Sequence, residues 1–272
     1  MNTQQSYRAS VRPVESYGPP DAARHAWLRE LLAEWPFAGE ARFGCYLISD
    51  SSGYSDLARA VECAVFQHYF GNAPSIMTAE YADYEAQSKF LLVVDREMRR
   101  PAGTLRIIEH SAAGFKSLND IEGEPLSIPL KKALAFHEID NLERCWDIGT
   151  LAVLSPYRGK STNHLVSTML YGLLHMQCRR FGIEHLVAIL DMHAFKQLTE
   201  LLAVPFVTIA DSQPFEYLGS PNSVASYLHV PRVVPTAEAF ISRLDGEMRK
   251  LLEPYLTRVI YGEGLPEVVE VE

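Results

Sequence analysis

The sequence predicts an α/β fold in which a mixed sheet carries helices on both faces. Several segments repeat apolar residues at helical spacing, and apolar runs of strand length lie between them. In the second half the order is strand, helix, strand, helix, strand, strand, which is typical of helices packed on a sheet. The chain has 272 residues and 47% hydrophobic content, which is enough to bury one sizeable core.

The N-terminal part is expected to contain two helices and three strands after a tail that extends to Pro20. Aspartate and serine are favourable N-cap residues at the start of a helix, and Pro36 and Gly71 follow the two expected helices as stop signals. The segment Pro74–Ser88 is polar and is expected to be a loop. The expected helices are Asp21–Trp35 and Ser55–Phe70, with Ser55 as a cap, and the expected strands are Phe43–Ser49, Phe90–Asp95 and Gly103–Glu109.

The C-terminal part is expected to alternate strands and helices around one long amphipathic helix, whose leucine and methionine stripe is typical of a core face. The expected helices are Leu130–Phe136, Leu165–Phe181, Ala194–Leu202 and a final one from Thr236 to Leu256; the expected strands are Trp146–Val153, Leu186–Leu190, Phe206–Ile209 and Tyr227–Val230. The acidic end, Gly262–Glu272, is expected to fray. We divide the chain into an N-terminal tail and helix (1–40), a central domain (41–235) and a C-terminal helix with an acidic tail (236–272).

Composition excludes several classes of function. The formal net charge is −9, which would repel a phosphate backbone and argues against general nucleic-acid binding. The four cysteines show no CxxC spacing, so no metal site is predicted. The first twenty residues lack the apolar core of a signal peptide, and no apolar run is long enough for a membrane span. We therefore expect a soluble, cytoplasmic protein.

A phosphate-binding loop is predicted after the strand Trp146–Val153, where Tyr157–Thr162 (YRGKST) precedes a long helix. Backbone N–H groups at a helix start can hold a phosphate, and Arg158 and Lys160 add positive charge. A nucleotide-hydrolase P-loop is excluded, because Leu154 occupies the position of its first glycine. The alternative is that Arg158 and Lys160 form a solvated charged turn.

The segment Leu151–Lys160 (LAVLSPYRGK) resembles the central motif of GNAT acyltransferases, and the resemblance continues through the following helix to Leu190. It implies a GNAT-type fold, with a mixed, mostly antiparallel central sheet, and a loop that holds the pyrophosphate of coenzyme A. Ser161 and Asn163 stand where that family has glycines or small residues. The implied cofactor-binding residues are Leu151, Ala152, Val153, Arg158, Gly159, Lys160, Ser161, Thr162 and Asn163.

An upstream stretch, from Val65 to Ile108, resembles acyl-homoserine-lactone synthases and long-chain N-acyl amino acid synthases. It is carried by Val65-Phe66, Ala82-Asp83-Tyr84 and Gly103–Arg106. Glu62 departs from the lactone synthases, which have an arginine there, so the wider N-acyltransferase class is favoured. The resemblance implies an acyl carrier protein as a further donor.

Asp147 is the first candidate for the catalytic base, because GNAT enzymes often place an acidic residue at the head of this strand. A carboxylate can remove the proton from an amine before it attacks a thioester. Glu138 is the second candidate. Tyr217 and His193 could protonate the leaving thiolate. Each of these residues has a structural alternative, as a strand-end, packing or helix-start residue.

The predicted function is transfer of an acyl group from acyl-CoA or acyl-phosphopantetheine to an amino acid or small-molecule amine, without a metal. The alternative is a non-catalytic GNAT-fold module that binds an acyl thioester or a protein partner. The acyl length, the amine, the choice between coenzyme A and carrier protein, and assembly as a homodimer stay open. Cys145 is expected to be a buried strand cysteine rather than an acylated one.

Overall fold

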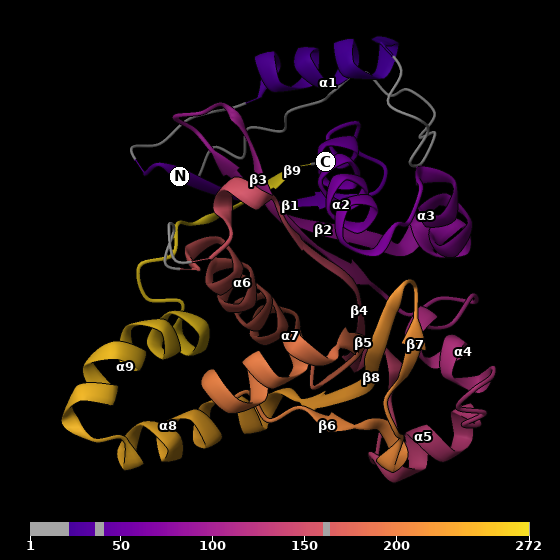
Figure 1. Cartoon of the computed structure of the whole chain (residues 1–272), viewed down its shortest axis with the longest axis vertical. Coiled ribbons are helices and arrows are strands. Elements are labelled where there is room, and N and C mark those ends of the chain that lie inside the picture. The colour runs from indigo at the N-terminus through magenta and orange to yellow at the C-terminus, as the bar shows by residue number, and fades with distance from the viewer. Residues whose placement is uncertain (1–21, 36–40, 160–163, 272) are drawn as a thin grey trace. The chain divides into compact units, whose positions relative to one another are not determined.

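The computed structural model describes residues 22–35, 41–159 and 164–271 (Figure 1). The chain divides into two compact units. The first unit comprises Met1–Ile107, Thr150–Leu170 and Pro266–Glu272, and the second comprises Ile108–Gly149 and Tyr171–Leu265. Strand β4 contributes residues to both units.

The first unit is built on the antiparallel pair of β1 and β2. β2 runs antiparallel to β1 with Phe43 opposite Asp95, and β9 runs parallel to β1 on its other edge. Apolar side chains of α1 and α2 pack on β1 and β2, with Trp35 edge-on to Tyr46 and Tyr54. Its elements are α1 (Ala22–Glu34), β1 (Phe43–Ser49), α2 (Ser55–Phe70), α3 (Pro74–Tyr81), β2 (Ser88–Asp95), β3 (Arg100–Ile108) and β9 (Val268–Val271).

The second unit is built on β5, which pairs with β4 on one edge and with β8 on the other. β8 also pairs antiparallel with β6 and β7. Its core gathers apolar residues from α4, α5, β5 and β8. Its elements are α4 (Lys116–Glu122), α5 (Leu130–Phe136), β4 (Cys145–Val153, shared), α6 (Leu165–Phe181, shared), β5 (His185–Asp191), α7 (Met192–Lys196), β6 (Val207–Thr208), β7 (Phe215–Tyr217), β8 (Ser220–His229), α8 (Val233–Arg243) and α9 (Gly246–Tyr261).

The expected α/β class with a mixed, mostly antiparallel sheet is confirmed. β1, α5 and α6 have the predicted bounds, and Gly71 ends α2 in a left-handed conformation, as expected. β4 and β5 share a sheet but do not pair over their full length. Their parallel ladder joins Cys145 to His185 and ends where Ile148 pairs with Ala188.

Four local predictions are wrong. The segment Pro74–Ser88 is not a loop: Pro74 opens α3, where its missing N–H costs nothing, and a 3-10 turn follows. Ser55 does not cap α2, since its hydroxyl donates to the carbonyls of Asp50 and Ser52. The expected final helix is two helices, α8 and α9, because Asp245 breaks the run and caps α9 by accepting from the Met248 N–H at 2.8 Å.

The fourth error concerns the C-terminal end, which is not frayed. Residues 268–271 form β9, and Val271 is buried in the same core cluster as β1. The helix α4 and the strand β7 were missed because both are short and hold their conformation through tertiary contacts.

Candidate functional site

Asp147 lies fully buried on β4 and is held by the first turn of α4. Ser117 donates its backbone N–H to one carboxylate oxygen at 2.6 Å and its hydroxyl to the other, also at 2.6 Å. Burial raises the pKa of Asp147 from its ordinary 3.8 to about 6, although both bonds from Ser117 and the charge of Lys116 oppose the shift. A carboxylate with such a pKa is mostly ionised at neutral pH yet basic enough to take a proton.

Lys116, the residue before Ser117, binds Asp120 and Tyr217, and its charge lowers the pKa of Asp147. Its buried ammonium donates to Asp120 Oδ2 at 2.6 Å, one helical turn on, and to the Tyr217 hydroxyl at 2.8 Å. The Tyr217 hydroxyl in turn donates to Asp120 Oδ2 at 2.5 Å. Two of the predicted residues, Asp147 and Tyr217, therefore belong to one polar cluster, defined here as Lys116, Ser117, Asp120, Asp147 and Tyr217.

A tight hairpin turn places Tyr217 in this cluster. Tyr217 pairs with Ser220, and the two residues between them, Leu218 and Gly219, both have left-handed backbones with φ of 45° and 79°. Such a pair of positive φ angles is the geometry of a two-residue β-hairpin turn, in which glycine is favoured. The turn fixes the end of β7 against β8 and so fixes the tyrosine that β7 carries.

Other predicted residues lie outside the polar cluster. Glu138 is exposed at a left-handed position after α5, and within the described residues no contact joins it to Asp147. His193 is exposed, and its backbone N–H donates to Asp191, which caps α7. Cys145 is buried, as expected, and burial raises the pKa of its thiol well above the ordinary value.

The strand end and loop of the predicted phosphate site lie in the first unit. Ala152 packs with Val61 and Val65 of α2, and Leu151 is half-buried. Arg158 bends back so that its Nε donates to the Val153 carbonyl at 2.8 Å.

The Arg158 guanidinium also stacks over the ring of Tyr69, at 4.0 Å from the ring centre. The pKa of Tyr69 is lowered by its hydrogen bond to Ser155 and by Arg158. Gly159 has φ of 77°, and no atom lies near the place where a side chain would be, so the loop turns at a left-handed residue. Lys160, Ser161, Thr162 and Asn163 lie outside the described residues.

The sequence did not reveal a buried ionic cluster in the first unit. Arg106 donates from Nε and Nη2 to the two oxygens of Glu62, at 3.1 and 3.0 Å, and both side chains are fully buried. The Thr150 hydroxyl donates to the same carboxylate. Arg106 also contacts Glu85, which pairs with Arg59 at 2.7 Å.

Charge pairing governs this ionic cluster. Burial raises the pKa of Glu85, but Arg106 and Arg59 outweigh that effect, and the net pKa is lowered. The cluster explains Glu62, the departure from the lactone-synthase pattern: it carries the charge that neutralises Arg106. Thr150 ties the ionic cluster to β4, three residues along the strand from Asp147.

Local sequence signals for the missed residues were weak. The spacing of Lys116 and Asp120 is the i,i+4 spacing of a helical ion pair, which could have indicated both α4 and the pair. Ser117 is thirty residues from Asp147, so no local pattern could have paired them. In the part of the chain that the structure describes, no group of three histidine, cysteine or acidic side chains could hold a metal ion, and no helix is long and apolar enough to cross a membrane.

Comparisons with known proteins identify the fold. No protein-family model and no curated protein matches the sequence. Among solved structures, FeeM, an N-acyl amino acid synthase from uncultured soil microbes, matches with a TM-score of 0.55 and 16% identity, over 75% of this chain and 99% of FeeM. The chain therefore has the fold of that synthase, which is the expected GNAT-type fold.

Two further solved structures are similar at lower scores. BjaI, a CoA-dependent acyl-homoserine lactone synthase solved with SAM and isopentyl-CoA, matches at a TM-score of 0.48 and 14% identity, over 84% of this chain and 93% of BjaI. An N-acetyltransferase-like protein from Lactobacillus plantarum matches at 0.43 and 16% identity, over 70% of this chain and 99% of the other.

Proposed function

Because the chain has the fold of an N-acyl amino acid synthase, we propose that it is an N-acyltransferase. It moves an acyl group from a pantetheine thioester, acyl-CoA or acyl carrier protein, to the amine of an amino acid or another small molecule. The observation that carries the proposal is the match to FeeM over nearly the whole of that protein, together with a buried acid on the strand that precedes the predicted phosphate loop.

Asp147 acts as the base in this proposal. An amine arrives protonated, and the carboxylate removes one proton, directly or through water, so that the nitrogen lone pair can attack the thioester carbonyl. The C–N bond forms, the C–S bond breaks as the thiolate leaves, and the second proton that the nitrogen loses passes to water. The pKa of about 6 supports this role, since the carboxylate is then ionised at neutral pH. Ser117 orients both carboxylate oxygens.

Tyr217 returns a proton to the leaving thiolate. Its hydroxyl lies between the Lys116 ammonium and the Asp120 carboxylate, so a proton that it gives up can be replaced from Lys116. The loop from Arg158 to Asn163 holds the donor's phosphates, and Arg158 supplies positive charge beside Tyr69. A backbone N–H near Ala152 or Val153 meets the developing oxyanion. If Asp147→Asn leaves turnover unchanged, Glu138 is the next candidate for the base.

The second candidate is a non-catalytic module that binds an acyl thioester or a protein. One observation favours it: Asp147 is fully buried and both of its oxygens are engaged by Ser117, which is also what a purely structural carboxylate would show.

One assay separates the two. The purified protein is incubated with pooled acyl-CoA and acyl carrier protein donors and pooled amines, and thiol release and N-acyl products are followed by mass spectrometry. The enzyme hypothesis expects a product whose formation falls about 100- to 10,000-fold in Asp147→Asn, the usual contribution of a positioned acid or base. Asp245→Asn serves as the control, because it makes the same change at an exposed carboxylate outside the polar cluster, where asparagine can still cap α9. Donor binding without any product would contradict catalysis and support the binding module.

A further inference from the structure

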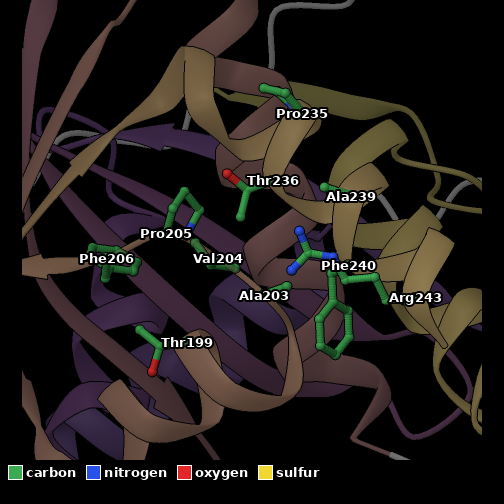
Figure 2. Close-up of a pocket in the computed structure, with 10 residues that line it drawn as sticks. All are labelled: Thr199, Ala203, Val204, Pro205, Phe206, Pro235, Thr236, Ala239, Phe240 and Arg243. Atoms are coloured by element: carbon green, nitrogen blue, oxygen red, sulfur yellow. The ribbon is translucent and has the colours of Figure 1, made fainter.

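A pocket in the second unit shares no residue with the polar cluster. Its volume is about 510 Å³, within the usual range for small-molecule sites. Two segments form it (Figure 2): the stretch that follows α7 and one face of α8. The lining residues are Thr199, Ala203, Val204, Pro205, Phe206, Pro235, Thr236, Ala239, Phe240 and Arg243.

The pocket is apolar at its base and polar at its rim. Ala203 and Val204 are buried at the bottom, and the half-buried rings of Phe206 and Phe240 form walls. Phe240 also packs against the core between α8 and α9, which fixes that wall. The α8 residues recur at helical spacing from Pro235 to Arg243, so a single helix face lines the site.

Of the ten described residues that line the pocket, Arg243 alone is charged. Figure 2 shows its guanidinium reaching from α8 in toward the middle of the ring of lining residues. Within residues 22–35, 41–159 and 164–271, no carboxylate pairs with that guanidinium, and the Thr236 hydroxyl has no hydrogen-bond partner. The pocket therefore carries one exposed positive charge without an ion-pair partner among the described residues and one available hydroxyl beside an apolar floor.

We propose that this pocket binds a small organic monocarboxylate whose apolar body lies on Ala203, Val204 and the two phenylalanine rings. The fork of a guanidinium matches a carboxylate in a two-bond geometry, and Thr236 can donate a further hydrogen bond. An amine is disfavoured because no carboxylate is among the described lining residues, and a doubly charged phosphate would meet a single cation. The proposal does not depend on acyl transfer.

Calorimetric titration of the full chain with octanoate tests the site, without any acyl donor present. We expect saturable binding to the wild type that weakens about 10- to 100-fold in Arg243→Gln, because a charge-assisted hydrogen bond is lost. Arg232→Gln removes an exposed arginine outside the pocket and should bind as the wild type does. Ala239→Phe should block the pocket from an exposed helix position, and circular dichroism checks that α8 is intact.

Two ligand controls complete the design. 1-Octanol has the same chain without the charge, so it should bind weakly and equally to the wild type and Arg243→Gln. 3-Phenylpropanoate replaces the chain by a ring and shows which body the walls prefer. The proposal is overturned if octanoate does not bind the wild type in the millimolar range. It is equally overturned if Arg243→Gln and Ala239→Phe bind octanoate as tightly as the wild type, since octanoate would then occupy another site.

Discussion

At the scale of single residues, the contact between Ser117 and Asp147 matters most, because it fixes the position of the proposed base and lowers its pKa against the larger effect of burial. The hydroxyl of Ser117 stabilises the ionised carboxylate, while burial opposes ionisation. The two effects together leave the pKa of Asp147 at about 6.

A pH profile follows from this pKa. In the wild type, turnover should rise with pH through an apparent pKa of about 6, as Asp147 ionises. Ser117→Ala removes a hydrogen bond that favours the ionised form, so the rising limb should move to higher pH. Ser242→Ala, at an exposed hydroxyl on α8, should leave the limb in place. A limb that stays at the same pH in Ser117→Ala would assign that serine to folding alone.

The same shift has a consequence for stability. The pKa of Asp147 is raised on folding, so its protonated form favours the folded state. That contribution is fully present below the ordinary pKa of 3.8 and is lost as the pH rises through about 6. It follows that part of the folding free energy is given up at neutral pH to keep a basic carboxylate buried.

The buried pair of Glu62 and Arg106 yields a second prediction at this scale. Glu62→Ala leaves the fully buried Arg106 without its closest countercharge, and the free energy of unfolding should fall by about 3–5 kcal/mol. Glu184→Ala breaks a solvent-exposed pair with Arg144 and should cost less than about 1 kcal/mol. Urea unfolding of both variants measures the difference. Similar losses in the two would mean that Glu85 alone compensates Arg106.

At the scale of elements, the close approach of α6 and α9 depends on Gly172. A side-chain carbon there would meet the Arg258 carbonyl oxygen at 2.5 Å and a methyl group of Leu265 at 2.8 Å. The first is a backbone atom and cannot turn away as a flexible side chain would. Helix α9 can therefore pack so closely on α6 only because this position carries no side chain.

Gly172→Ala should accordingly destabilise the protein by about 1–3 kcal/mol, although alanine is the better helix former. Gly246→Ala is the matched control, because a methyl group at this position, at the start of α9, would meet no other atom. This change should leave the stability unaltered or raise it slightly. Thermal unfolding followed by circular dichroism compares them. A stabilised Gly172→Ala would show that α9 can shift without loss.

At the scale of the whole molecule, the last residues of the chain complete the strand order of the first unit. β9 covers the edge of β1 from Cys45 to Ile48, and Val271 enters the core with Leu57 and Phe90. An uncovered β1 would present unpaired backbone groups, which promote association between chains.

Deleting residues 266–272 should therefore lower the unfolding temperature and cause concentration-dependent association. The expected loss is about 2–4 kcal/mol, from a buried valine and the lost ladder. Val271→Ala separates these effects, since it removes only side-chain burial and should keep the protein monodisperse. Light scattering and thermal unfolding are the measurements. A truncated protein that unfolds at the wild-type temperature would show that β9 contributes nothing.

The sequence by itself determined the α/β class, the bounds of β1, α2 and α6, and the strand that carries Asp147, because these depend on periodic apolar patterns and on local stop signals such as Gly71, which ends α2. Only the tertiary structure decided the short or polar elements. α3 and α4 are too short to form alone, and β9 exists because β1 offers an edge. The tertiary structure also decided which buried polar side chains meet. Ser117 binds Asp147 across thirty residues of sequence, and Arg106 binds Glu62 across forty-four. Contacts between such distant residues depend on packing rather than on any local pattern.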